Sequence, residues 1–221
     1  MCIRVHLCLK SFFLFFGNHP MSLIDDILGE QGLFAQKLDD YEFRQEQIEM
    51  AHAVFKAIMN KKHIVVEAGT GVGKSFGYLV PALLSLNPED KPIVVSTNTI
   101  NLQEQLIQKD LPWLKENLGI PFSYELGKGR GNYISLRRLG LALEKKNTLF
   151  ETDAQGEELR AIGQWVQQSM DGSKSSLSFN PSHQVWDQVQ SDKDNCLGRK
   201  CPTYSKCFYY KARNALKNAD L

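Results

Sequence analysis

The chain has 221 residues, of which 43% are apolar and 23% are charged, and its formal net charge is +1. This composition is typical of a folded globular chain with one large or two small domains, and it excludes disorder of the whole chain. The near-zero charge excludes a global field that attracts nucleic acid or membranes, so such binding would depend on local clusters.

The first twenty residues differ from the remainder. An apolar run from Phe12 to Phe16 resembles a short signal peptide, but Lys10 interrupts it and no small-residue cleavage site follows. The run is far shorter than the roughly 20 apolar residues that span a bilayer, so we expect no membrane segment. We predict that translation begins at Met21 and that residues 1–20 are a non-native or disordered extension.

Five cysteines are present, with Cys2 and Cys8 near the N-terminus and the other three between residues 196 and 207. The odd number argues against a closed disulfide framework. In a reducing compartment, clustered thiols more often hold metal than form disulfides. We therefore expect a cytoplasmic location.

The first predicted elements are a helix, a strand and a second helix. Apolar residues recur at helical spacing over 44–60, which predicts an amphipathic helix. The β-branched run at 63–67 predicts a strand. A glycine-rich stretch follows, and a helical pattern returns over 76–86.

A second cycle repeats this order. It consists of a strand at 93–96 and a helix over 100–109 that we expect to end near Pro112, and a third strand is predicted at 122–126. Strands that alternate with helices predict a parallel sheet with crossover helices, the α/β class.

Beyond about Tyr133 the pattern changes to helices and loops. Helices are predicted over 156–170 and 209–219, with a stretch rich in serine and glycine between residues 171 and 181. We therefore divide the chain into 1–20, 21–133 and a mainly helical part at 134–221.

The glycine-rich stretch has the composition of a phosphate-binding loop. Glycines let backbone N–H groups point inward at phosphate oxygens, and the helix N-terminus adds a favourable dipole. Lys74 would neutralise the β- and γ-phosphates of ATP and the Ser75 hydroxyl would bind Mg²⁺. A flexible glycine turn is the alternative interpretation. The predicted loop residues are Ala68, Gly69, Thr70, Gly71, Val72, Gly73, Lys74 and Ser75, with Ala68 in place of the usual first glycine.

The segment before the loop, Tyr41 to Gln47, resembles the adenine-reading motif of superfamily 2 helicases, with Arg44 and Gln47 at its two signature positions. A glutamine amide can both donate to and accept from the adenine edge. By itself, Gln47 would be interpreted as a solvated helix residue, but beside the glycine-rich loop the adenine-reading role is favoured.

The segment after the second strand is similar to the helicase segment that holds the DNA backbone. Short hydroxyl and amide side chains at a helix N-terminus suit contact with phosphate, although Thr97 or Thr99 could also serve as a helix N-cap. The candidate DNA-binding residues here are Thr97, Asn98, Thr99 and Gln103.

The stretch Gly127-Lys128-Gly129-Arg130-Gly131-Asn132-Tyr133 matches the glycine-rich basic segment of DinG-type helicases, relatives of the XPD group. We include Lys128 and Arg130 among the candidate DNA-binding residues. The resemblance implies a RecA-like first motor domain that is incomplete here, with an iron–sulfur insertion beginning near this segment.

The three clustered thiols, Cys196, Cys201 and Cys207, resemble the last three cluster cysteines of that family. At the position of the first cluster cysteine the chain has Ser135, which is a poor substitute for a thiolate. The thiols could instead bind zinc together with His183, or they could be ordinary buried or free cysteines.

The resemblance implies an ATP-dependent DNA helicase that moves 5′ to 3′ on single strands and uses ATP, Mg²⁺ and an iron–sulfur cluster. The sequence reaches Leu221 without the family's Asp-Glu-Ala-His motif. We therefore expect the chain to be an N-terminal fragment that hydrolyses ATP poorly by itself. A separately encoded C-terminal portion could complete the helicase.

Two other functions fit some of these features. One is a non-catalytic accessory protein that binds ATP and DNA and has a three-cysteine metal site. The other is a small-molecule kinase that uses the same loop, although nothing in the sequence resembles a lid or an acceptor site.

Overall fold

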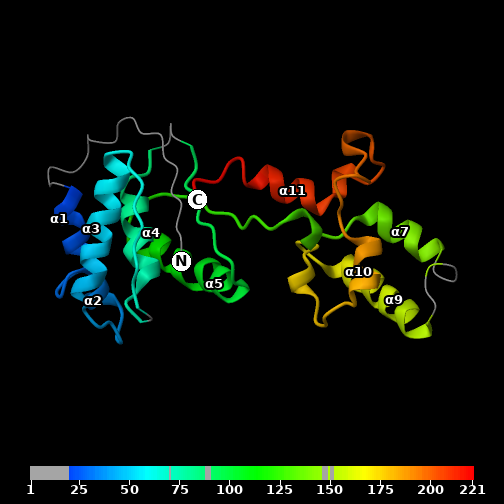
Figure 1. Cartoon of the computed structure of the whole chain (residues 1–221), viewed down its shortest axis with the longest axis horizontal. Coiled ribbons are helices and arrows are strands. Elements are labelled where there is room, and N and C mark those ends of the chain that lie inside the picture. Colours follow the sequence, from blue (N-terminus) through cyan, green and yellow to red (C-terminus); the bar gives the residue numbers. More distant parts are fainter. Residues whose placement is uncertain (1–19, 70, 88–90, 146–148, 150–151) are drawn as a thin grey trace. The chain divides into compact units, whose positions relative to one another are not determined.

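The computed structural model describes residues 20–221 except 70, 88–90, 146–148 and 150–151 (Figure 1). The prediction for residues 1–20 therefore lies almost entirely outside the described residues. The chain forms two compact units: one extends to Glu125 and also contains Ala219–Leu221, and the other is Leu126–Asn218. In sequence, the second unit is thus an insertion into the first.

Helices dominate the first unit. It contains α1 (Pro20–Leu28), α2 (Leu33–Lys37), α3 (Gln45–Met59), α4 (Lys74–Leu84), α5 (Ile100–Gln105), the π-helical turn η1 (Leu106–Asp110) and α6 (Leu111–Asn117). The two helices predicted around the glycine-rich loop are confirmed as α3 and α4, although α4 begins at Lys74 rather than at residue 76.

Helices α3 and α4 pack against each other and supply much of the first core. An aromatic cluster closes one side of it. The Phe34 ring is buried and lies 4.7 Å from Phe76 and 4.4 Å from Trp113, between ring centroids. A fully buried aromatic side chain contributes about 1.5–3 kcal/mol by burial, so this cluster helps to hold the start of α4 in place.

The helix predicted to end near Pro112 continues past it, which corrects that prediction. It passes from α5 through η1 into α6 and ends at Asn117. Proline is tolerated in the first turn of a helix because the N–H that it lacks would have no helical partner there. The π-helical turn η1 ends at Asp110, and the α-helical segment α6 begins at Leu111. Pro112 therefore lies in the first turn of α6.

The three segments predicted as strands, 63–67, 93–96 and 122–126, form no strand in the part of the chain that the structure describes. This corrects the predicted parallel sheet. The segments are extended, and their side chains alternate as in a strand that is covered on one face. Val66 packs against the core, whereas Val65 is 83% exposed.

The reason lies in the backbone hydrogen bonds. Extended backbone forms a sheet only when a neighbour about 4.8 Å away supplies bonds along its length. Among the described residues, bonds of this kind join the C-terminal residues to two of the segments. Ile93 N donates to Asp220 O at 2.8 Å, Glu125 N donates to Leu221 O at 3.0 Å, and the N–H groups of Asp220 and Leu221 donate to Ser123 O at 3.1 Å.

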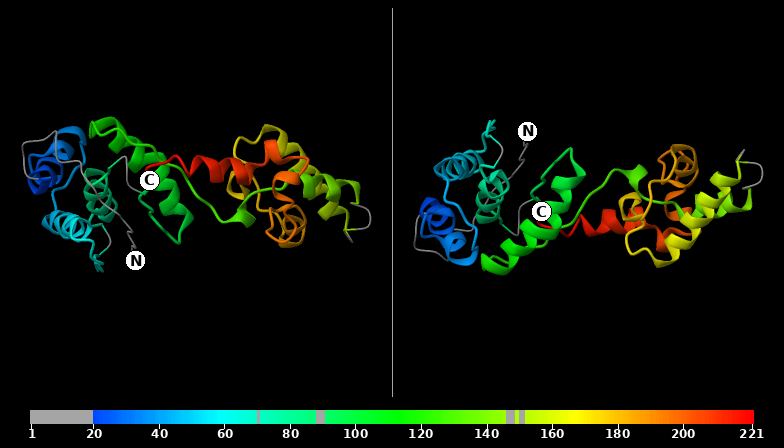
Figure 2. Two further views of the ribbon diagram at one scale, coloured as in Figure 1. Left: turned by 90° about the horizontal axis from the view of Figure 1, so that it is seen from above. Right: turned by 90° about the horizontal axis from the view of Figure 1, so that it is seen from below.

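The second unit is built from helices and short turns (Figures 1 and 2). It contains η2 (Arg130–Asn132), α7 (Leu136–Glu144), α9 (Asp153–Gln168), η3 (Lys174–Ser176), α10 (His183–Val189), η4 (Gly198–Lys200), η5 (Tyr204–Lys206) and α11 (Phe208–Ala215). The helices predicted over 156–170 and 209–219 are confirmed as α9 and α11, with shifted bounds.

A separate core holds the second unit together. The side chains of Ile134, Leu159, Ile162, Val185 and Val189 are fully buried in it. Two isolated antiparallel bridges, Tyr133 to Ser173 and Ile134 to Gln190, tie the entry segment to the rest of the unit. None of the described helices of either unit has the length and apolarity needed to cross a membrane.

Candidate functional site

The glycine-rich loop lies between the extended segment 63–67 and helix α4. Gly71 and Gly73 have φ angles of 87° and 72°, in the left-handed region that residues with a Cβ rarely adopt. Gly73 is the N-cap of α4, so the helix begins directly after the loop. The first N–H groups of α4 have no helical carbonyl to bind, which is the arrangement that binds anions at a helix start.

The Lys74 side chain folds back over this loop. Its ammonium group donates to the carbonyl of Ala68 at 3.2 Å and also to the carbonyl of Gly69. Positive charge therefore lies beside the helix N-terminus, where the helix dipole is also positive. A negatively charged phosphate would be attracted by both.

The Gln47 side chain fastens the loop to α3. It is buried, and its Nε2 donates to the Gly73 carbonyl at 2.8 Å. The Tyr41 hydroxyl donates to the Leu28 carbonyl at 2.6 Å and lies 3.3 Å from Gln47 Oε1. In this structure the predicted adenine-reading glutamine therefore contacts the phosphate loop and Tyr41.

The other predicted nucleotide residues lie nearby or outside the described residues. Arg44 is the N-cap of α3 and pairs with Glu42, and its side chain is 37% exposed. Val72 lies against Gly69 within the loop. Thr70 is one of the residues that the structure does not describe.

Ser75 lies in a polar cluster that the sequence analysis missed. The Asp110 carboxyl and the Tyr78 phenol near it are both buried, and the Tyr78 hydroxyl has no hydrogen-bond partner in the described part of the chain. Burial raises the pKa of Asp110, partly offset by hydrogen bonds from Gln105 and Ser75 and by the charge of Lys109. Burial also raises the pKa of Tyr78 to about 12; the Ser75 hydroxyl lowers it and the Asp110 charge raises it further. Asp110 gave no sequence signal because its burial depends on how η1 packs, which the sequence pattern does not show.

The candidate DNA-binding residues of the first unit surround the start of α5. Thr99 is the N-cap, but no side chain caps the helix, and Thr99 N donates to Thr97 Oγ1 at 3.4 Å. Asn98 and Thr99 are exposed, and Gln103 is half-buried on α5. The N-cap position is thus confirmed for Thr99 without the side-chain bond that usually accompanies it.

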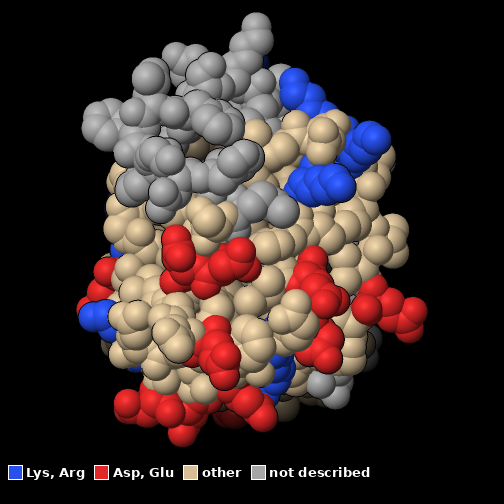
Figure 3. Space-filling model, turned by 90° about the vertical axis from the view of Figure 1, so that its left-hand side faces the viewer, with Lys and Arg blue, Asp and Glu red and all other residues tan. Residues whose placement is uncertain are grey.

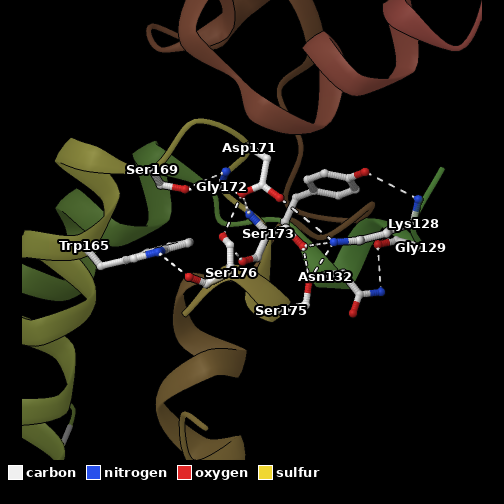
Figure 4. A network of polar contacts seen from close by, with 11 residues as sticks. Lys128, Gly129, Asn132, Trp165, Ser169, Asp171, Gly172, Ser173, Ser175 and Ser176 are labelled. Carbon is white, nitrogen blue, oxygen red and sulfur yellow. Dashed lines mark hydrogen bonds and ion pairs between the residues drawn. The ribbon is translucent and has the colours of Figure 1, made fainter. Parts of the chain in front are cut away.

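In the second unit, Lys128 is the centre of a polar network (Figure 4). Its ammonium donates to Ser173 Oγ at 2.7 Å and to Ser175 Oγ at 2.6 Å, and it lies 4.0 Å from Asp171 Oδ2. Asp171 Oδ1 in turn accepts from Ser176 Oγ at 2.7 Å. The stretch rich in serine and glycine is therefore an ordered loop that surrounds a lysine with only 16% of its side chain exposed.

Arg130 lies against two tyrosine rings. Its guanidinium carbon is 4.1 Å from the Tyr209 ring centroid and 6.0 Å from the Tyr210 ring centroid. Arg130 Nη1 donates to the Asp192 carbonyl at 3.1 Å. Burial lowers its pKa, but hydrogen bonding and charge effects from Tyr209, Cys196 and Tyr210 outweigh burial, so the pKa is raised. Arg130 stays fully charged.

The three clustered thiols and Ser135 line one small cavity of about 30 Å³. Ser135 is also the N-cap of α7, where its hydroxyl accepts from Arg138 N at 3.4 Å. Among the described residues, no three cysteine, histidine, aspartate or glutamate side chains approach closely enough to form a metal site. His183, the alternative fourth ligand, is exposed at the start of α10 and does not line this cavity.

Two of these sulfurs have polar neighbours within hydrogen-bonding distance. Gly198 N donates to Cys196 Sγ at 3.4 Å, the Tyr210 hydroxyl lies 3.9 Å from the same sulfur, and Cys201 Sγ lies 3.3 Å from Thr203 Oγ1. Burial raises the pKa of Cys196, but hydrogen bonds from Gly198 and Tyr210 and the Arg130 charge outweigh it and lower the pKa. These contacts favour the thiolate form, which is the form that binds metals.

One face of the first unit is strongly acidic. Figure 3 shows carboxylates gathered on the side where α1, α2 and α3 lie in Figure 1. Such a face repels the phosphate backbone of nucleic acid, so DNA contacts of this unit must lie elsewhere. Exposed acidic residues of this region are Asp25, Asp26, Glu30, Asp39, Asp40, Glu42, Glu46 and Glu49.

Comparison with known proteins identifies the relatives of the chain. Residues 49–152 match the DEAD/DEAH box helicase family. The chain is 37% identical over 199 residues to the ATP-dependent DNA helicase YoaA of Haemophilus influenzae, covering 90% of this chain and 30% of that protein. It is also 37% identical over 194 residues to the ATP-dependent helicase DinG of Mycobacterium tuberculosis, covering 80% and 29% respectively. A 3′-5′ exonuclease DinG of Bacillus subtilis is 27% identical over 194 residues, covering 87% and 20%.

These matches cover most of the chain but only about 30% of the length of the two helicases. A helicase domain of this kind implies a RecA-like fold, although the described residues of the first unit form helices and no strand. The chain is therefore homologous over most of its length to ATP-dependent helicases named YoaA and DinG, and residues 49–152 match the DEAD/DEAH box helicase domain.

Proposed function

We propose that the chain is the ATP-binding and single-stranded-DNA-binding part of an ATP-dependent DNA helicase that moves 5′ to 3′. The observation that carries this proposal is the loop before α4, where Lys74 donates to the Ala68 carbonyl and Gln47 donates to the Gly73 carbonyl. Its homology to proteins named ATP-dependent helicases supports the same function.

For the nucleotide we propose the following roles. Lys74 neutralises the β- and γ-phosphates, and the loop amides from Gly69 to Gly73 surround them. Ser75 holds Mg²⁺, which would neutralise charge on the transferring phosphate. Arg44 and Gln47 contact the adenine, which requires Gln47 to exchange its present partners for the base.

The nucleotide proposal can be tested by titrating the purified chain with a fluorescent ATP analogue in the presence of Mg²⁺. Lys74→Ala should abolish binding because the main positive charge of the loop is lost. Lys62→Ala is the matched control, since Lys62 is exposed at the end of α3 and outside the loop. Equal affinity of Lys74→Ala and the wild type would contradict the assignment.

For DNA we propose that the backbone lies along the start of α5, at Thr97, Asn98, Thr99 and Gln103, with Lys128 and Arg130 of the second unit also contributing. The tyrosine rings beside Arg130 support a role in single-strand binding, because aromatic and guanidinium groups stack on bases. Lys128 should contribute less to DNA binding than Arg130, because its ammonium is already hydrogen-bonded to two serines.

Fluorescence polarisation with a labelled oligonucleotide at several salt concentrations tests this division. Arg130→Gln should weaken single-strand binding and reduce the slope of log K against log salt by about 1, as expected for one lost phosphate contact. Lys193→Gln, at an exposed position of the same unit, is the control. If both variants bind like the wild type, Arg130 does not contact DNA.

We further propose an iron–sulfur cluster held by Cys196, Cys201 and Cys207, with Ser135 at the fourth position. The four side chains line one cavity, and the hydrogen bonds to Cys196 and Cys201 suit thiolate ligands. A cluster would add electron-transfer or structural capacity to the second unit. Iron and zinc analysis of protein prepared without oxygen, together with its visible absorbance, tests this; a colourless zinc protein would contradict it.

A second candidate function is nucleotide and DNA binding without turnover, with or without a separately encoded partner. Phosphate release from ATP, measured with and without single-stranded DNA, separates the two. DNA-stimulated release that disappears in Lys74→Ala would refute the non-catalytic alternative.

A further inference from the structure

Leu221 forms the hydrogen bonds of a parallel strand pair with the extended segment 122–126. Its N–H donates to the Ser123 carbonyl at 3.1 Å, and its carbonyl accepts from Glu125 N at 3.0 Å. In a parallel ladder, one residue bonds in this way to the two residues that flank its partner, so Leu221 pairs with Tyr124. These two bonds fix the direction and the register of this edge.

The opposite edge of the C-terminal residues pairs with the extended segment 93–96. Ile93 N donates to the Asp220 carbonyl at 2.8 Å. An antiparallel pair would need the reciprocal bond from Asp220 N, but that N–H already donates to the Ser123 carbonyl. This edge is therefore parallel too, and Ile93 pairs with Leu221.

Side chains agree with both registers. Ile93 is buried in the first core, and Tyr124 and Leu221 pack against that core, so the three paired residues share one face. Asp220 is directed instead to Ser123, whose N–H and hydroxyl donate to Asp220 Oδ2 at 2.8 Å and 2.7 Å. The C-terminal residues are thus held in register between two parallel neighbours.

The ladder has open positions beyond Leu221. The Ile93 carbonyl and the Val95 N–H face the edge that bonds Asp220, because the backbone groups of every second residue of a strand face the same edge. Neither group has a backbone hydrogen-bond partner among the described residues, and within them the Glu125 carbonyl on the opposite edge has none either. Each segment lies one strand spacing, about 4.8 Å, from Leu221, so one strand fits between them.

Apolar side chains flank these positions on both faces. Val95 packs against the first core, and Val94 is 60% exposed on the other face. A residue that follows Leu221 in the ladder would lie beside Val94, and the next residue would lie beside Val95. Strands covered on both faces are nearly continuous runs of valine, isoleucine and leucine, so such a run fits here best.

We propose that the Ile93 carbonyl, the Val95 N–H and the Glu125 carbonyl form a strand-addition site, which binds an extended apolar segment of the remaining helicase polypeptide parallel to both neighbours and in line with Leu221. The relatives give the reason for this occupant, because the chain spans only about 30% of their length. The inference rests on the proposed function only for the identity of the partner.

The probe is a short acetylated peptide of four valine and isoleucine residues followed by two lysines for solubility. Amide hydrogen exchange of the purified chain measures its binding without any activity. Saturating peptide should slow exchange of the Val95 N–H by about tenfold or more, and it should leave the Val94 N–H, which faces the opposite edge, unchanged. N-methylation of the third peptide residue removes the N–H that would donate to the Val95 carbonyl, and it should weaken binding by about tenfold. N-methylation of the last lysine is the control.

Val95→Pro and Val94→Pro are a matched pair of protein variants. Each places a proline in extended backbone that proline can adopt, but only Val95→Pro removes an N–H that faces the site. Val95→Pro should weaken binding of the labelled peptide about tenfold in fluorescence polarisation, and Val94→Pro should bind like the wild type. If Val95→Pro does not fold, the N-methylated peptides test the same edge on the unchanged protein.

Three results would overturn the strand-addition site: no protection of the Val95 N–H by saturating peptide, equal affinity for the two N-methylated peptides, or equal binding by the two proline variants. If Val95 becomes protected in concentrated protein without peptide, and sedimentation shows a dimer, the occupant is a second copy and the proposed partner is wrong. Nucleotide binding is read separately. If Lys74→Ala binds an ATP analogue as well as the wild type, the nucleotide function fails while the peptide results stand.

Discussion

The side-chain amide of Gln47 donates a 2.8 Å hydrogen bond to the backbone carbonyl of Gly73, 26 positions further along the chain. This bond ties α3 to the residue at which the phosphate loop becomes α4. The contact is also close: a Cβ placed on Gly73 would lie 2.1 Å from Gln47 Nε2. The loop conformation therefore depends on the absence of a side chain at Gly73.

Gly73→Ala should destabilise the first unit by about 1–3 kcal/mol, because alanine is strained at a φ of 72° and its Cβ displaces Gln47. Chemical denaturation followed by circular dichroism measures the loss. Gly140→Ala is the control: Gly140 lies inside α7, and a Cβ at this position would have nothing within 4 Å, so alanine there should stabilise by about 0.5–1 kcal/mol. Equal effects at the two positions would show that the loop is not held as described.

Lys128→Met should destabilise the second unit by about 1–3 kcal/mol, because the fully buried Ser173 loses its charged partner and Asp171 loses a neighbouring positive charge. Lys193→Met, at an exposed site, should have little effect. Tryptophan fluorescence in a Trp113→Phe background reports on this unit alone, because Trp165 and Trp186 both lie within it. If Lys128→Met is as stable as the wild type, the network does not depend on Lys128. The ammonium of the wild-type protein would then be available to bind DNA.

The stability contributed by Asp110 should fall as pH rises. Burial raises its folded-state pKa above the unfolded value, so the stabilising protonated form is complete below the unfolded pKa and is lost as pH passes the folded pKa. Asp110→Asn has no such titration. Its melting temperature relative to the wild type should therefore increase as the pH rises above the ordinary aspartate pKa, measured in EDTA without nucleotide. A difference that stays constant with pH would contradict this.

Ser135→Cys should increase the iron retained by the chain and its visible absorbance, because a thiolate at this wall of the cavity completes four sulfur ligands. Ser182→Cys is a closely matched control. Ser182 caps α10 with the same 3.4 Å hydrogen bond by which Ser135 caps α7, so both variants lose about 1 kcal/mol of capping. Ser182 does not line the cavity, so iron should rise in Ser135→Cys alone. Equal iron in both variants would remove Ser135 from the proposed ligand set.

Local sequence patterns predicted the helices with a clear apolar period and the glycine loop, because helix formation and left-handed backbone depend on neighbouring residues. The 3.6-residue period over 44–60 gave α3, and the glycines at 71 and 73 have the positive φ angles that a phosphate loop requires. The pattern at 93–96 gave an extended segment with an inward Ile93 but could not specify a strand, because a strand requires a partner.

The tertiary structure decided which distant residues meet. Lys128 lies among Ser173 and Ser175, and Ser135 lines a cavity with three cysteines that follow it by more than sixty positions in sequence. No local pattern encodes these meetings, because each depends on how helices pack after the backbone has folded. The sequence by itself determined the chemistry that is available, and packing determined which groups are close enough to use it.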